Sequence, residues 1–219
     1  MELKHGELAR LLEEGAAELG VGLDEAAIAA FSAYLDELKA WNRRINLTSI
    51  DSDREAVVRH FLDSLTPYRH IKGAGRLLDI GAGAGFPGIP LKIADPFMEV
   101  TLVDSVEKKV HFMRNVIRKL GLKGIEAVSG RVEDRSLIAR YAFGFDCVIS
   151  RAFTGLKRFL ELSLPYLKGG GSIVAMKGPS YKDELEEACG IKGLEPPQVY
   201  EVKVPFEQRS TTLVIFKKR

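Results

Sequence analysis

The chain has 219 residues, of which 46% are hydrophobic and 28% charged, as is ordinary for one α/β domain with a small accessory unit. No apolar run approaches the roughly 20 residues that span a membrane, and the N-terminus lacks a signal-peptide core, so we expect a cytoplasmic protein. The two cysteines form neither a metal-binding pattern nor a disulfide framework, and we predict no metal site.

The net charge of +2 does not by itself indicate a nucleic-acid partner, but the charges are unevenly distributed. Residues 1–70 contain 8 Lys/Arg against 13 Asp/Glu, whereas residues 71–219 contain 24 against 17. We therefore predict a helical subdomain over 1–70 and an α/β domain over 71–219. Any polyanion should bind mainly to the second part.

Helical spacing of apolar residues predicts three helices before residue 70, over residues 2–19, from Asp24 to about Leu38, and from Ser52 to Pro67. The polar segment WNRRINLTSI (41–50) is typical of an ordered loop, and Arg43, Arg44 and Asn46 in it are candidate donors to RNA. His60 lies on the polar face of the third helix. Either it is an ordinary surface or capping histidine, or it contacts RNA.

The segment LLDIGAGAGFPGIPL (77–91) predicts a buried strand, a glycine turn and a helix. Gly81, Gly83 and Gly85 allow a sharp turn and let a ligand approach the backbone closely. The spacing G-x-G-x-G differs from the dinucleotide fingerprint G-x-G-x-x-G, and the Gly-Lys-Ser/Thr of a phosphate-binding loop is absent. The segment therefore predicts a nucleotide-binding corner of another kind.

Two acids stand at the ends of successive predicted strands. Asp79 would repel a pyrophosphate but suits a cationic amino-acid group, such as the methionine part of S-adenosylmethionine. Asp104 closes the next apolar strand, where an acid accepts hydrogen bonds from ribose hydroxyls, and Ser105 follows it. The alternative is that both acids merely cap strand ends.

From residue 76 onward strand and helix patterns alternate, which predicts a mostly parallel sheet, and the last two strands, 198–205 and 211–217, form a hairpin. Ligands bind beyond the carboxyl ends of such strands. On the acceptor side these ends, and the hairpin loop, supply the cations Arg151, Lys177 and Arg209. The position after the fourth strand reads Ser-Arg-Ala-Phe rather than Asn-Pro-Pro-Tyr, and Cys147 should be buried. We therefore expect an acceptor atom with a free lone pair and assign no general base.

The segments WNRRINLTSI, RHFLDSL, LLDIGAGAGFPGIPL, LVDSVEKKVHFMRNV, GRVED, SRAF, MKG and RSTTLVIFKK, in this order, resemble the bacterial GidB/RsmG family of 16S ribosomal RNA (guanine-N7) methyltransferases. The resemblance extends from about Leu38 to the C-terminus. It implies a class I S-adenosylmethionine-dependent methyltransferase fold, with a Rossmann-like seven-stranded sheet, a terminal antiparallel hairpin and an N-terminal helical extension. It also places five residues at cofactor-contacting positions: Gly81, Phe86, Val132, Glu133 and Arg151.

The resemblance implies methyl transfer from S-adenosylmethionine to N7 of one guanine in 16S rRNA, or in the small ribosomal subunit, with S-adenosylhomocysteine as product. RNA phosphates are expected to meet Arg43, Arg44 and the basic helix 106–120, including Lys108 and Lys109. We expect a monomer. The alternatives are a methyltransferase acting on a small molecule or protein, and a non-catalytic nucleotide-binding protein of ribosome assembly.

Overall fold

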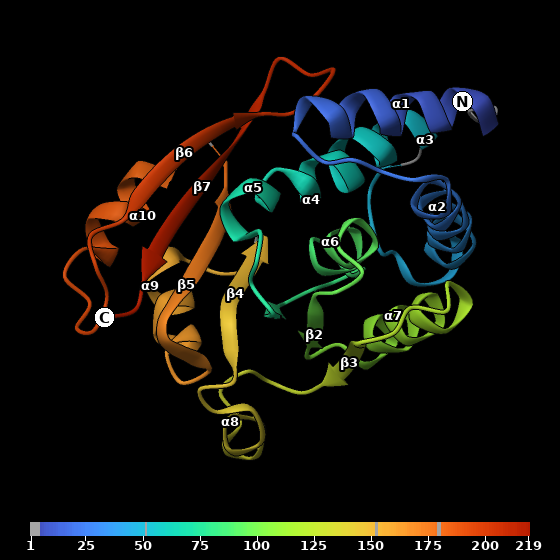
Figure 1. Ribbon diagram of the computed structural model, residues 1–219. Coiled ribbons are helices and arrows are strands. Elements are labelled where there is room, and N and C mark those ends of the chain that lie inside the picture. Colours follow the sequence, from blue (N-terminus) through green and yellow to red (C-terminus); the bar gives the residue numbers. More distant parts are fainter. Residues whose placement is uncertain (1–4, 51, 152, 179–180) are drawn as a thin grey trace.

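The computed structural model describes residues 5–50, 52–151, 153–178 and 181–219. A seven-stranded sheet crosses the molecule in the order β3-β2-β1-β4-β5-β7-β6 (Figure 1). Its strands are β1 (Arg76–Ile80), β2 (Glu99–Asp104), β3 (Ile125–Ser129), β4 (Phe145–Arg151), β5 (Leu167–Lys177), β6 (Gln198–Lys203) and β7 (Ser210–Lys217). Strands β1 to β5 are parallel, and β7 runs antiparallel to both β5 and β6, so the predicted terminal hairpin is confirmed.

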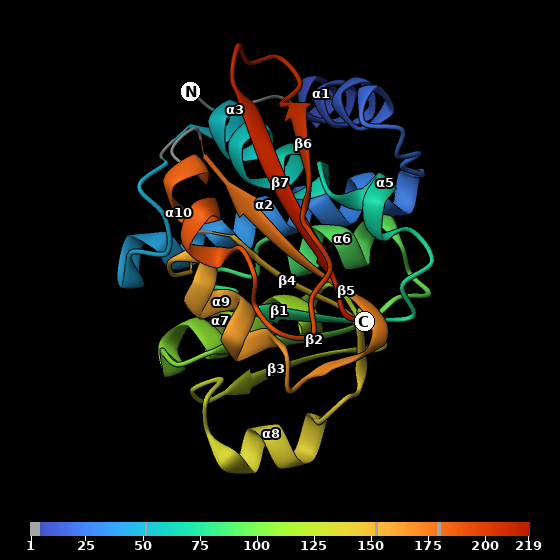
Figure 2. The same ribbon diagram turned by 90° about the vertical axis from the view of Figure 1, so that its left-hand side faces the viewer.

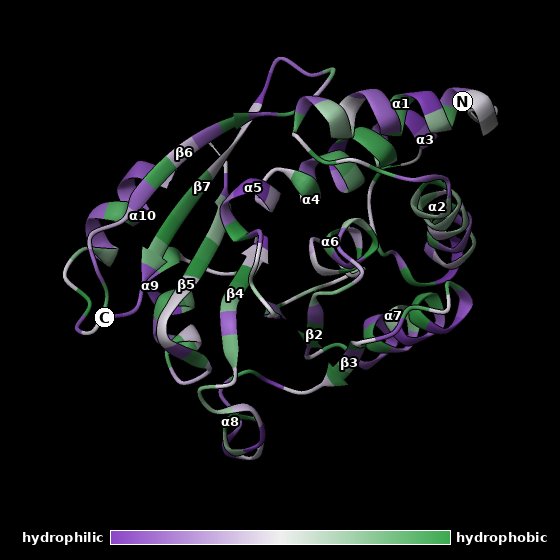
Figure 3. Ribbon diagram, in the orientation of Figure 1, coloured by the Kyte–Doolittle hydropathy of each residue, from purple (hydrophilic) through white to green (hydrophobic). Residues whose placement is uncertain are grey.

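Helices cover both faces of the sheet (Figure 2). Alternate residues of each central strand point to opposite faces and belong to two different apolar clusters, each packed with its own helices. One cluster contains Leu77 and Cys147 with α1 (His5–Glu18), α2 (Glu25–Ile45), α6 (Gly88–Ala94) and α7 (Glu107–Lys119). The other contains Leu78 and Val148 with α8 (Arg135–Tyr141), α9 (Leu156–Ser163) and α10 (Tyr181–Ala188). Figure 3 shows β4, β5 and β7 as mainly hydrophobic, as expected for strands buried on both sides.

Side-chain caps set the ends of the N-terminal helices. Asp24 accepts a hydrogen bond from the Ala27 N–H at 2.8 Å and begins α2. Ser52 and Glu55 form the predicted capping box, in which Ser52 Oγ accepts from Glu55 N–H and donates to Glu55 Oε2. The helix that follows is not uniform, because a π-helical segment, η1 (Val57–Leu62), separates α3 (Asp53–Ala56) from α4 (Asp63–Leu65).

The N-terminal helices share one core with the sheet rather than packing apart from it. Phe31 and Phe61 lie in the same apolar cluster as strand residues, and the Tyr34 hydroxyl donates to the Ala84 carbonyl in the glycine turn. The predicted linker 68–75 contains a short helix, α5 (Tyr68–Ile71). A division at residue 70 therefore stays a prediction. Within the described ranges no helix is long and apolar enough to span a bilayer.

Candidate active site at the carboxyl edge of the sheet

The glycine turn follows β1 as predicted. Gly81, Gly83 and Gly85 have φ angles of 70°, 61° and 92°, a region that side chains other than glycine rarely adopt. Space is also limited, because a Cβ on Gly81 would lie 2.4 Å from the ring of Phe153. Glycine at this position therefore serves both the turn and the close approach of a side chain from beyond β4.

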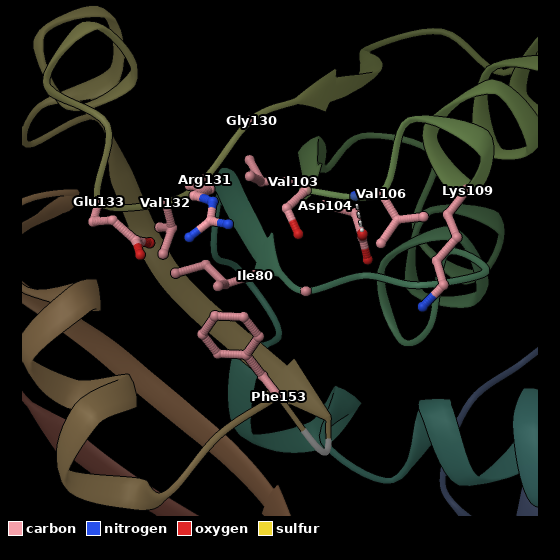
Figure 4. A pocket seen from close by; sticks show the side chains of 12 residues that line it. Ile80, Val103, Asp104, Val106, Lys109, Gly130, Arg131, Val132, Glu133 and Phe153 are labelled. Carbon is pink, nitrogen blue, oxygen red and sulfur yellow. Dashed lines mark hydrogen bonds between the residues drawn. The ribbon is translucent and has the colours of Figure 1, made fainter.

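A cavity of about 420 Å³ opens beside this turn, over the ends of β1, β2 and β3 (Figure 4). Its lining includes five of the residues predicted to bind a cofactor: Gly81, Asp104, Ser105, Val132 and Glu133. Ile80 and Arg131 also line it, and they belong to the strand ends that the sequence places around a cofactor. The other lining residues were not predicted for this role: Val103, Val106, Lys109, Gly130 and Phe153. Phe153 is two positions beyond the end of β4 and Lys109 is near the start of α7, so their positions in the sequence could have indicated a place at the site.

Asp104 organises the rim of this cavity. Its Oδ2 accepts from the Gly83 N–H and its Oδ1 from the Val106 N–H, both at 2.8 Å. The carboxylate therefore joins the glycine turn to the start of α7, and only 7% of the residue is exposed. Each oxygen retains a lone pair for a ligand hydroxyl on the cavity side.

Asp79 lies outside the cavity lining that the structure describes, so its predicted contact with a cofactor stays a prediction. The side chain is fully buried, with Oδ2 accepting from the Gly88 N–H at 2.8 Å, while Oδ1 has no hydrogen-bond partner in the structure. Burial raises the pKa of this carboxyl to about 7, against the opposing effects of the Gly88 N–H and the Arg151 charge. Its observed contact is thus the one expected of a strand-end cap that fixes the first turn of α6.

Gly83, Gly85, Phe86 and Arg151, also predicted to bind the cofactor, do not belong to the described lining of the cavity either. Phe86 is buried, with its ring centroid 5.5 Å from that of Tyr34 and 4.7 Å from that of His60. It supports the turn from the side of the N-terminal helices. Its direct contact with a cofactor stays a prediction.

Arg151, at the end of β4, is the centre of a second group of side chains, which we call the arginine cluster: Arg151, His60, Asp63, Phe86 and Thr211. The guanidinium donates to Asp63 Oδ2 at 3.2 Å and to the Arg59 carbonyl at 3.1 Å, and it lies 5.0 Å from the Phe86 ring centroid. Thr211 of β7 donates to the other Asp63 oxygen. The cluster therefore joins η1, α4, β4 and β7 around one buried ion pair.

His60 belongs to this cluster rather than to the surface. Its ring stacks on Phe86 with an interplanar angle of 17°, Nε2 lies 2.7 Å from Thr48 Oγ1, and Nδ1 lies 3.3 Å from Arg151 Nη2. Burial and the Arg151 charge lower the pKa of His60 to about 3, so the ring is neutral at physiological pH. Both ring nitrogens already have partners within the protein, which leaves neither free for the predicted contact with RNA.

The other two predicted acceptor-side cations differ from each other. The Lys177 ammonium donates to Glu184 Oε2 at 2.7 Å and to the Thr154 carbonyl at 2.9 Å, and 12% of its side chain is exposed. It therefore anchors the segment after β4. Arg209 is 42% exposed and lies 4.0 Å from Asp63, so it extends the arginine cluster toward the solvent.

The predicted RNA contacts lie at two places. Arg43, Arg44 and Asn46 are exposed at the C-terminal end of α2, where Asn46 has a left-handed backbone conformation and ends the helix. Lys108 is exposed on α7, whereas Lys109 turns toward the cavity (Figure 4). Lys109 could therefore contact either an RNA phosphate, as predicted, or the cofactor.

Residues 27–210 match the GidB family, which is described as rRNA small subunit methyltransferase G. Proteins named ribosomal RNA small subunit methyltransferase G are 48% identical to this chain in Geobacter sp. (strain M21), over 81% of each chain, and 43% identical in Geobacter sulfurreducens, over 96% of this chain and 97% of that protein. The chain belongs to the GidB family. The crystal structure of cofactor-bound Rv0187 from MTB, at 18% identity, superposes with a TM-score of 0.61 over 100% of this chain and 99% of that one, which shows a shared fold.

The cavity fits the nucleoside cofactor expected of a GidB protein. Its volume lies in the usual range for small-molecule sites of roughly 300–1,000 Å³. Asp104 and Glu133 place carboxylates where ribose hydroxyls or an amine could donate to them, and Ile80 and Val132 offer apolar surface for a purine ring. In the part of the chain that the structure describes, no group of acidic, His or Cys side chains could hold a metal ion.

Proposed function

We propose that this protein transfers a methyl group from S-adenosylmethionine to N7 of a guanine in 16S rRNA, in the cytoplasm and as a monomer. Membership of the GidB family supports an rRNA substrate, because that is the activity in the family's description. The cavity beside the glycine turn supports the cofactor. When bound, this cofactor would supply an electrophilic methyl group on a sulfonium.

The observation that best supports N7 as the acceptor is the neutral His60 within the arginine cluster. A general base must take up a proton near neutral pH, and a ring with a pKa of about 3 does so poorly. The carboxylate of the arginine cluster, Asp63, is already bound by Arg151 and Thr211. Guanine N7 has an unprotonated lone pair, so its methylation needs correct positioning rather than proton removal.

Cationic side chains at the arginine cluster are the groups that would recognise the guanine. Guanine presents O6 and N7 as acceptors, and Arg or Lys is their usual partner. Arg209, an exposed cation beside the cluster, is the candidate for O6 or a neighbouring phosphate, which would leave N7 free for the methyl group. Arg151 would orient the base and the cofactor from the buried side.

The test is incubation of small ribosomal subunits that lack this modification with the protein and methyl-labelled S-adenosylmethionine. Labelled nucleotides are then located by mass mapping, and borohydride reduction followed by aniline cleaves the strand selectively at 7-methylguanosine. We expect one labelled guanine and one cleavage site. Label on protein, on a small molecule, or on an exocyclic amine that resists aniline would contradict the proposal, and S-adenosylhomocysteine serves as the competing control.

A further inference from the structure

A chain of hydrogen bonds connects the predicted RNA-contacting loop to the end of β4. Asn42 of α2 holds the backbone of Thr48 from both sides, with Nδ2 donating to its carbonyl at 2.9 Å and Oδ1 accepting from its N–H at 2.8 Å. The Thr48 hydroxyl lies 2.7 Å from His60 Nε2, and His60 Nδ1 lies 3.3 Å from Arg151 Nη2. Three segments far apart in the sequence therefore meet at one imidazole.

The partners of His60 fix its tautomer. A guanidinium has only donors, so Nδ1 must accept from Arg151, and a neutral ring then has its proton on Nε2. Nε2–H donates to Thr48 Oγ1, which also accepts from the Ile50 N–H at 3.1 Å. The Nε2–H tautomer, which suits the contacts with Arg151 and Thr48, thus links the loop to Arg151 by consecutive hydrogen bonds.

The surroundings keep the imidazole in place. The π-helical segment that contains His60 is a type of irregularity that recurs at functional sites, and the ring stacks on Phe86, which the Arg151 guanidinium also contacts. The charged groups that act on the ring are cations, Arg151 from β4 and Arg209 from the β6–β7 loop, whereas the Asp63 carboxylate accepts from Arg151. Each of them favours an uncharged ring.

We propose that His60, as the Nε2–H tautomer, is a positioning residue that ties Arg151 to the loop at Thr48, so that the RNA-contacting loop and the methyl-transfer site hold one geometry. This inference rests on the proposed function. It assigns His60 neither proton transfer nor a direct contact with RNA. The Thr48 hydroxyl is the second positioning group.

The tautomer is tested first, in the free protein and without any assay of activity. Long-range proton–nitrogen NMR spectra, assigned by comparison with His60→Gln, should show Nε2 protonated and Nδ1 unprotonated, with little change from pH 8 to pH 5. A proton on Nδ1, or titration near the ordinary value of about 6.5, would overturn the proposal.

The positioning role is tested by single-turnover methylation at saturating cofactor and saturating small subunits. Thr48→Val should slow transfer about tenfold, because the partly buried hydrogen bond that holds His60 is lost, while calorimetry shows cofactor affinity within about threefold of the wild type. Thr48→Ser, which keeps the hydroxyl, should restore the rate. A decrease confined to cofactor affinity would overturn the assignment.

Thr66→Val is the control for a lost threonine hydroxyl, since Thr66, at the end of α4, donates to the Asp63 carbonyl at 2.8 Å, outside the chain of bonds to Arg151. It should lose at least as much stability as Thr48→Val, because its hydroxyl is the more deeply buried of the two, and keep the wild-type rate. Equal slowing of both variants would reduce Thr48 to a structural role. If the wild type transfers no methyl group to rRNA, the proposed function fails, and the NMR spectra still decide the tautomer.

Discussion

The two halves of the sheet's carboxyl edge are built differently. Over β1 to β3 lies an open cavity whose central acid, Asp104, binds backbone N–H groups of the adjoining turns. Over β4 and β7 the side chains bind one another, and Asp63 joins residues 88 and 148 positions away in the chain. The first half can receive a ligand with little rearrangement of side chains, whereas in the second any substitution disturbs several partners at once.

The largest effect is therefore expected at Arg151. Arg151→Ala removes the principal partner of a buried carboxylate, so we expect a loss of roughly 3–5 kcal/mol in the free energy of unfolding and a fall of about 100-fold or more in the transfer rate. Arg151→Lys keeps the charge but lacks the planar guanidinium that reaches three partners. Its stability and transfer rate should therefore lie between those of the wild type and of Arg151→Ala. Urea unfolding and single-turnover rates measure both effects. If Arg151→Ala is as stable as the wild type, the contacts among the side chains over β4 and β7 do not stabilise the fold.

The next effect concerns Asp79 and depends on pH. A raised pKa of about 7 means that the folded state keeps a proton which the unfolded chain releases near 3.8, so this residue makes stability fall as pH rises between about 4 and 7, by roughly 1.4 kcal/mol per pH unit. His60 acts oppositely, because its folded pKa of about 3 makes stability fall as pH drops below about 6.5. In the wild type the two slopes oppose each other.

Asp79→Asn should expose the slope of His60. Relative to the wild type, the variant should gain about 1 kcal/mol or more per pH unit from pH 5 to pH 7, since it has no proton to lose there. Urea denaturation at half-unit pH steps measures this difference. Parallel stability curves for variant and wild type would show that burial does not raise the pKa of Asp79.

The sequence predicted the cavity over β1 to β3 better than the arginine cluster over β4 and β7. The glycine turn and Asp104 are local to one strand–turn–helix pattern, so spacing alone located them, and the sheet with its terminal hairpin followed from the alternation of apolar segments. The partners of Arg151 and Lys177 were beyond reach, because each depends on contacts between distant elements. Asp79 shows the limit within a local motif, since the sequence could not reveal that its carboxylate is fully buried and accepts from the Gly88 N–H.

The cavity half should show a smaller, purely local loss. Asp104→Ala leaves the N–H groups of Gly83 and Val106 without their acceptor, and we expect cofactor affinity to fall by roughly 1–3 kcal/mol in calorimetric titration. Asp104→Asn retains one acceptor and should lose less. The transfer rate at saturating cofactor should change little in either variant, and a large fall in that rate would extend the role of Asp104 into the second half.

The smallest effects separate two neighbouring lysines on α7. Lys108 is exposed to solvent, so Lys108→Ala should lower the slope of log affinity for RNA against log salt by about 1, the contribution of one phosphate contact, and leave cofactor binding unchanged. Lys109 lines the cavity, and Lys109→Ala should weaken cofactor binding by a few-fold because a partly screened charge beside the ligand is worth about 1 kcal/mol at most. Titrations of both variants with RNA fragments across salt concentrations, and with cofactor by calorimetry, measure the two effects side by side. If Lys109→Ala changes the salt slope and leaves cofactor affinity unaltered, Lys109 contacts RNA rather than the cofactor. The charged groups of the cavity that remain to bind the cofactor would then be its carboxylates and Arg131.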